Sequence, residues 1–262
     1  PRRVQAARQS MHHLVAKAPW SDEALLAAVQ RQVLPAMTRR QPVVAWIVDD
    51  TGIPKKGRHS VGVARQYCGQ LGKQDNCQVA VTLSVATWEA SLPVAYRLYL
   101  PREWAEDRAR RRKAGVPEEI EFQTKPEIAL DQIRAALDSG LPCGAVLADA
   151  GYGADTRFRE QLGELGLQYV VGIQASVSVW RPGEEPLPAK PRGKLGRPPK
   201  LLRRTKDHRP VSARELVLEC GERAWRTVTW REGSNRRLKS RFLALRVRPA
   251  HRDYWRAEPH EE

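Results

Sequence analysis

Two aspartates, Asp49 and Asp149, stand directly after short apolar runs at residues 43–48 and 144–148. Runs of this length followed by acids and glycine indicate strands buried on both faces. If the two strands are neighbours, both carboxylates emerge at the same sheet edge, where open α/β sheets place their sites. Carboxylates gathered there form an oxygen site for Mg²⁺ or Mn²⁺. Such ions can activate a water or hydroxyl against a phosphodiester.

A more ordinary interpretation competes with this one. A single aspartate at a strand end usually caps a turn or a helix. Two aspartates at comparable positions make the two interpretations about equally strong, and the neighbouring residues must decide between them.

The elements that would position the acids follow from apolar spacing. Helices are expected over 4–15 and from Ser21 to about residue 33, where Pro35 ends or kinks the second one. Strands are expected over 43–48, 77–87, 93–100, 144–148 and 169–173. Thr124 and Glu127 form a capping box that opens a helix ending at Gly140, and a further helix runs between Asp155 and Gly166. The pattern predicts an α/β core.

The late part of the chain has a different character. Residues 181–200 are rich in Pro, Gly, Lys and Arg, which predicts a basic loop. Short strands are expected over 216–219, 226–230 and 241–247, with a turn at 233–235. We therefore expect four segments. They are a helical segment at 1–40, a core at 41–180, the basic loop at 181–200 and a β-rich insertion at 201–262.

Composition narrows the class of protein and of partner. The 262 residues include 45 Lys plus Arg against 30 Asp plus Glu, a net charge of +15, and 41% are apolar. These values exclude collagen-like, disulfide-scaffold and disordered chains. The positive excess favours a polyanionic partner, nucleic acid rather than a membrane surface. The absence of a long apolar run or signal-like start predicts a cytoplasmic protein without a membrane partner. The four cysteines have no metal-binding or disulfide spacing.

Basic side chains gather after the first acid, at 108–113 and in the tripeptide Gly196-Arg197-Pro198. Each group either holds DNA phosphates or is simply solvated, and for the tripeptide a flexible loop is favoured over minor-groove insertion. The residues predicted to contact DNA are Lys55, Lys56, Arg58, Arg65, Arg110, Arg111, Arg112 and Arg197. Gln66 and Gln78 are further polar candidates.

Aromatic residues have two interpretations as well. Trp46 and Trp88 are expected in the core or in strands. Trp104, Trp180 and Trp255 could stack on extruded bases, although core packing is favoured for each. Tyr152 as a transesterification nucleophile is not favoured, because no cluster of Arg and His accompanies it.

Several longer motifs occur in order along nearly the whole chain. They are DDTGIPKKG at 49–57, SVGVARQYCG at 60–69, NCQ at 76–78, LYLPREW at 98–104, ADAGYG at 148–153, WREG at 230–233 and RVRPA at 246–250. This set resembles a branch of insertion-sequence transposases, the one numbered seven hundred and one. That branch lies in the DDE superfamily of RNase H-like endonucleases.

The resemblance implies an RNase H-like mixed sheet with flanking helices, and a metal-dependent transposase acting on transposon ends and target DNA. Its catalytic and metal-binding acids would be Asp49 and Asp149, with Asp50 as the alternative to Asp49. A third acid, a Glu on a helix after the insertion, is expected beyond Glu262, so the chain is interpreted as a fragment. The cofactor would be Mg²⁺ or Mn²⁺, and a homodimer in a synaptic complex is one option. The rival functions are a stand-alone Mg²⁺ nuclease and a non-catalytic DNA-binding remnant.

Overall fold

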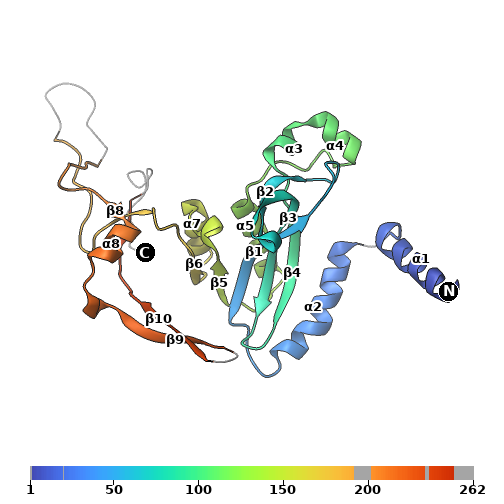
Figure 1. Ribbon diagram of the computed structural model, residues 1–262, viewed down its shortest axis with the longest axis horizontal. Helices are drawn as coiled ribbons and strands as arrows, with labels where there is room; N and C mark the ends of the chain where they lie inside the picture. The colour runs from blue at the N-terminus through green and yellow to red at the C-terminus, as the bar shows by residue number, and fades with distance from the viewer. Residues whose placement is uncertain (1, 20, 192–201, 234–235, 251–262) are drawn as a thin grey trace. The chain divides into compact units, whose positions relative to one another are not determined.

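The computed structural model describes residues 2–19, 21–191, 202–233 and 236–250. It divides into two compact units, Pro1–Gly172 and Ile173–Glu262 (Figure 1). We describe each unit by itself. No helix in the described ranges combines the length and apolar character needed to cross a membrane.

A mixed six-stranded sheet forms the centre of the first unit. Its strands are β1 (Ala45–Pro54), β2 (Ala64–Cys68), β3 (Lys73–Ala86), β4 (Ser91–Leu98), β5 (Ala145–Ala148) and β6 (Tyr169–Val171). The long β3 pairs antiparallel with β2 and β4 and also with β1. β1 pairs in parallel with β5, and β5 in parallel with β6. This mixed sheet with flanking helices is compatible with the expected RNase H-like fold.

The first acids lie inside β1 and not after it, contrary to the sequence-based expectation. β5 pairs with β1 only from Ala45 to Val48, which is where the apolar run stops. The antiparallel ladder with β3 continues to Pro54 on the other side of β1. The apolar pattern therefore marks the part of β1 that has strands on both sides, and the strand itself extends further.

The first unit also contains helices. They are α1 (Arg2–Ala16), α2 (Asp22–Thr38), α3 (Arg102–Glu106), α4 (Arg108–Ala114), α5 (Lys125–Asp138), α6 (Ala150–Gly153) and α7 (Thr156–Glu164), with a 3₁₀ turn, η1 (Gly69–Leu71). Among these helices, α2 and α5 contact the sheet directly. The Thr124–Glu127 capping box at the start of α5 and the Asp155 cap of α7 are confirmed. Pro35 lies inside α2, which continues to Thr38.

The main core is the contact between the sheet and α5 and α7. Trp46 and Val48 of β1 pack with Leu83 of β3, Ile133 of α5 and Phe158 of α7, and all of them are buried. Gln132 of α5 also donates a hydrogen bond to the carbonyl oxygen of Val81 (3.0 Å). The core therefore fixes β1 and β5, the strands that carry the acids, relative to the helices behind them.

Two polar stretches contain more regular structure than their composition predicts. β2 lies within 55–73, and α3 and α4 lie within the Arg- and Glu-rich stretch after β4. A small second core holds these elements together, with Val63, Leu100 and Trp104 buried at its centre.

The second unit contains mostly short strands in its described residues. Its elements are β7 (Ser178–Trp180), β8 (Val211–Ser212), α8 (Ala213–Glu219), η2 (Glu222–Ala224), β9 (Arg226–Glu232), β10 (Arg237–Phe242) and β11 (Arg248–Pro249). The strand expected at 216–219 is wrong: Ser212 and Glu215 form a capping box that starts α8 there. The strand expected at 241–247 begins earlier and ends at Phe242. Arg197 lies outside the described residues, and so do residues 234 and 235 of the turn predicted at 233–235.

Candidate active site and basic surface

Asp49 and Asp149 follow residues that are paired across two neighbouring parallel strands. Val48 of β1 is the register partner of Ala148 of β5, and each aspartate is the next residue along the chain. Neighbouring strands lie about 4.8 Å apart, so the two acids leave adjacent strands at the same level. Both are exposed. The juxtaposition expected from the sequence is therefore present in the backbone.

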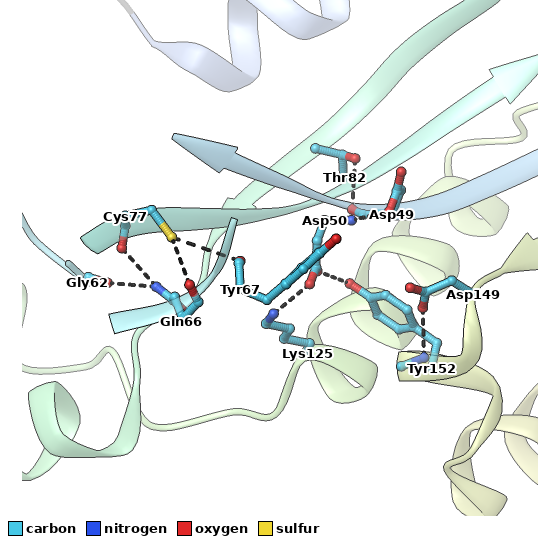
Figure 2. Close-up of polar contacts among 11 residues, drawn as sticks. Asp49, Asp50, Gly62, Gln66, Tyr67, Cys77, Thr82, Lys125, Asp149 and Tyr152 are labelled. Atoms are coloured by element: carbon cyan, nitrogen blue, oxygen red, sulfur yellow. Dashed lines mark hydrogen bonds and ion pairs between the residues drawn. The ribbon is translucent and has the colours of Figure 1, made fainter. Parts of the chain in front are cut away.

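Asp49 and Asp50 are distinguished by their surroundings. Successive residues of a strand point to opposite faces, and Figure 2 shows the two side chains on opposite sides of β1. Oδ1 of Asp49 accepts a hydrogen bond from the Asp50 amide (2.7 Å). The Thr82 hydroxyl donates to the backbone oxygen of Asp49 (2.9 Å), which ties this position to β3.

Asp50 is bound on both carboxylate oxygens. Nζ of Lys125, at the start of α5, donates to Oδ2 at 2.5 Å, and the hydroxyl of Tyr152 donates to Oδ1 at 2.6 Å (Figure 2). The Asp50 side chain is about one-third exposed, with a relative exposure of 34%. Sequence reasoning missed both partners. Lys125 and Tyr152 lie 75 and 102 positions after Asp50 in the sequence, and no local pattern connects positions so far apart.

Asp149 is also the N-cap of the short helix α6. Its Oδ1 accepts a hydrogen bond from the amide of Gly151 (2.8 Å). The turn packs closely on the sheet, because a Cβ added at Gly153 would lie 2.0 Å from the carbonyl oxygen of Gly172. The capping interpretation and the catalytic interpretation of this aspartate are therefore compatible.

Tyr152 is buried, with 2% relative exposure, and its ring lies 5.9 Å from that of Phe158, centroid to centroid. Burial raises the pKa of its hydroxyl far above the ordinary value, and the charges of Asp50, Asp149 and Asp49 add to the increase. The phenol therefore stays protonated and serves as a donor to Asp50, an arrangement that gives no support to a nucleophilic Tyr152.

The donor chemistry at the two acids fits a hard divalent cation. Oδ2 of Asp49 and Oδ2 of Asp149 have no hydrogen-bond or ion-pair partner among the described residues. Mg²⁺ commonly binds through one or two carboxylates together with waters and substrate phosphate. Within the described part of the chain, no group of three or more His, Cys, Asp and Glu side chains is arranged to hold a metal.

The loop between β1 and β2 brings basic side chains next to the end of β1. Side chains from β3 hold this loop by its carbonyl groups. Nδ2 of Asn76 donates to Lys55 (2.7 Å) and Gly57 (2.9 Å), and Nε2 of Gln78 donates to Val61 (2.6 Å). Lys56, Arg58 and Arg65 are exposed and Lys55 is half-buried. The loop is therefore fixed by neutral amides, which leaves its charged side chains at the surface.

The basic run of α4 joins the same surface. Nη2 of Arg110 donates to the carbonyl oxygen of Arg58 (3.0 Å), and its guanidinium stacks on Trp104 at 3.7 Å from the ring centroid. We call residues 55–65, which are the loop and the first two residues of β2, together with α4 the basic surface.

Arg111 differs from its neighbours on α4. Its guanidinium donates to the carbonyl oxygens of Ala105, Pro117, Glu118 and Ile120. Arg112 is exposed. Of the arginines predicted on α4, Arg110 and Arg111 thus have structural contacts, whereas Arg112 points to solvent.

The amide nitrogens of Gln66 and Gln78 are also committed within the protein. Gln66 donates to the carbonyl oxygen of Cys77 (3.0 Å), and Gln78 to that of Val61 (2.6 Å). Trp46, Trp104 and Trp180 are fully buried, which confirms core packing for them. Trp88 is 82% exposed in the turn between β3 and β4, so its expected core position is wrong. Trp255 lies outside the described residues.

A family model described as a DDE superfamily endonuclease matches residues 2–237, and the chain belongs to this family. The chain is also 35% identical over 170 residues to a protein of Microchaete diplosiphon named "Probable transposase for insertion sequence element IS701". That alignment covers 64% of this chain and 41% of the relative, so the chain spans less than half of the relative's length. The resemblance drawn from the motifs is confirmed.

Proposed function

We propose that this chain carries the first two catalytic acids of a DNA transposase that cleaves transposon ends and transfers the freed strands. The observation that carries the proposal is the placement of Asp49 and Asp149 directly after Val48 and Ala148, which are register partners on adjacent parallel strands. Family membership and the relative's printed name support the choice of reaction.

In this proposal Asp49 and Asp149 hold Mg²⁺ or Mn²⁺. When bound, such an ion activates a water or a 3′-hydroxyl and offsets the charge that develops at a phosphodiester. Asp49 is preferred over Asp50 because both oxygens of Asp50 already bind Lys125 and Tyr152. The exposed oxygens of Asp49 and Asp149 remain available among the described residues.

The basic surface would orient the DNA. Charged donors that are held in place set the position of a duplex without reading its sequence. The residues that would contact phosphates in this way are Lys55, Lys56, Arg58, Arg65 and Arg112. Arg110 would act mainly by holding the loop through Arg58. Two copies of the chain, each with one DNA end, would form the synaptic complex, and the protein would act in the bacterial cytoplasm.

Cation binding gives the first test. Mn²⁺ titration of the purified chain, followed by electron paramagnetic resonance, should give a bound signal that Asp49→Asn and Asp149→Asn each remove. Asp75→Asn is the matched control, because Asp75 is an aspartate on β3 whose carboxylate pairs with Lys73. Unchanged Mn²⁺ binding in both acid variants would overturn the proposal.

A labelled DNA carrying the ends of the encoding element separates the reaction classes. Joined products that depend on Asp149 indicate a transposase, and cleavage without joining indicates a stand-alone nuclease. Binding without metal-dependent cleavage indicates a non-catalytic DNA-binding protein. This second candidate is favoured because the described residues contain no group of three or more His, Cys, Asp and Glu side chains arranged to hold a metal.

A further inference from the structure

Asp50 joins three elements that are far apart in the sequence. It lies on β1, its Oδ2 accepts from Lys125 of α5, and its Oδ1 accepts from Tyr152 of α6 (Figure 2). The Lys125 side chain is itself shielded, with 28% relative exposure, and its ammonium lies 5.4 Å from the ring centroid of Tyr99. A carboxylate bound at both oxygens by two fixed donors has a single favoured orientation.

We call the hydrogen bond between the Tyr152 hydroxyl and Asp50 the link. Its Tyr152 end belongs to the turn that carries the second acid, Asp149. Tyr152 lies three residues after Asp149 in the same turn, and the turn is closed by the amides of Tyr152 and Gly153, which donate to the Asp149 carbonyl oxygen. Close backbone packing of Gly153 on Gly172 leaves this turn little room to shift toward the sheet. Anchoring the Tyr152 hydroxyl therefore also fixes the turn that presents the Asp149 carboxylate.

The link spans the place where the strand ladder stops. β1 and β5 pair over only four positions, ending at Val48 and Ala148, and both acids come after that end. Beyond it, the hydrogen bond from Tyr152 to Asp50 connects the chain that carries Asp49 to the turn that carries Asp149.

We propose that Asp50 and Tyr152 are positioning residues that hold Asp49 and Asp149 in register, and that Asp50 is not itself a cation ligand. This inference rests on the proposed function, since it concerns the acids proposed there to bind metal. Outer partners that orient ligands typically change metal affinity by about 10- to 100-fold when removed.

Mn²⁺ affinity of the full chain tests the inference. Tyr152→Phe and Asp50→Ala each break the link, so each should weaken Mn²⁺ binding about tenfold without changing the number of ions bound. The double variant should be no weaker than the weaker single variant, because the link is already broken. Tyr96→Phe, an exposed tyrosine of β4, is the control and should bind as the parent does.

Asp50→Asn separates positioning from direct ligation. The amide keeps an oxygen that can accept from Tyr152 but loses the charge, so its Mn²⁺ affinity should stay well above that of Asp49→Asn. Loss of binding equal to that of Asp49→Asn would make Asp50 a ligand and overturn the inference. Thermal melting of the metal-free variants shows whether each is folded, and the Asp50→Asn comparison decides the matter if Tyr152→Phe does not fold.

The failures of the two proposals are distinguishable. If Asp49→Asn and Asp149→Asn bind Mn²⁺ as the parent does, the proposed function fails. If those variants lose Mn²⁺ while Tyr152→Phe and Asp50→Ala keep the parent affinity, only the positioning role fails. Additive losses in the double variant would also overturn it, because independent effects are not expected from the two ends of one link.

Discussion

The indole nitrogen of Trp104 on α3 donates a hydrogen bond of 2.7 Å to the carbonyl oxygen of Val63, the residue just before β2. Both residues are buried, so this bond joins the small core to the loop that carries Lys56 and Arg58. The charged loop is therefore held by a contact that involves none of its charges.

Trp104→Phe should weaken this attachment while keeping an aromatic core. Leaving the buried Val63 carbonyl without its donor should lower the free energy of unfolding by about 1–3 kcal/mol in urea titration. Cleavage within the loop 55–63 by limited proteolysis should rise in parallel. Trp88→Phe is the control: Trp88 is 82% exposed, so its stability should change by less than about 0.5 kcal/mol. Equal effects of the two substitutions would contradict this role.

Neighbouring arginines of α4 should respond differently to truncation. Arg111→Ala removes donors from several backbone carbonyls and should reduce stability by about 1–3 kcal/mol. Arg112→Ala should leave stability within about 0.5 kcal/mol. It should weaken binding to duplex DNA of any sequence and lower the slope of log affinity against log salt by about 1. Fluorescence anisotropy at several salt concentrations measures this slope, and an unchanged slope argues against a phosphate contact at Arg112.

Two helical glycines should have opposite sensitivities to an added methyl group. Gly153→Ala places its Cβ against the Gly172 carbonyl and should destabilise the chain by about 1–3 kcal/mol. Gly163 of α7 has no atom within 4 Å of an added Cβ. Gly163→Ala should therefore stabilise the chain by about 0.5–1 kcal/mol through higher helix propensity. Thermal unfolding of the two variants against the parent measures the difference, and destabilisation by both would show that α7 does not tolerate the change.

The capping box of α5 gives stability that depends on pH. Hydrogen bonds from the amide and hydroxyl of Thr124 hold the pKa of Glu127 below the ordinary value of 4.5. This contribution is fully present above about pH 4.5 and is lost as the pH falls through the lower folded-state pKa. The melting-temperature difference between the parent and Glu127→Gln should therefore become smaller as the pH falls below about 4.5.

Two further variants check the capping box. Thr124→Ala should cost about 1 kcal/mol at neutral pH. Glu119→Gln, at an exposed glutamate outside the box, should show no comparable pH-dependent difference. A melting-temperature difference for Glu127→Gln that does not vary with pH would contradict the assignment.

Local signals predicted much of the first unit. The α5 cap needs only Thr124 and Glu127 three residues apart, and the apolar strand residues before Asp49 and Asp149 follow from their runs in the sequence. These features depend on residues close in sequence, so a single sequence suffices. The motifs also led to the correct family, because their order along the chain is itself informative.

Contacts between distant residues could not be read in the same way. The pairing of Asp50 with Lys125 and Tyr152 depends on how β1, α5 and α6 pack, and no local spacing encodes it. The extension of β1 beyond Val48 depends on the length of β3, a partner later in the chain. The predicted strand at 216–219 failed for a different reason: the Ser212–Glu215 box is a local helix signal that apolar alternation concealed.

The strands carrying Asp49 and Asp149 are anchored to very different extents. Asp49 lies within a ten-position ladder with β3, whereas Asp149 follows a strand of four residues and begins a one-turn helix. Segments held by few backbone hydrogen bonds open locally, at a lower free-energy cost than global unfolding. Amide exchange should therefore be faster around Asp149 than around Asp49. Because the Tyr152–Asp50 hydrogen bond connects the turn after Asp149 to β1 beyond the ladder with β5, breaking this bond would release the second carboxylate while the first stays paired with β3.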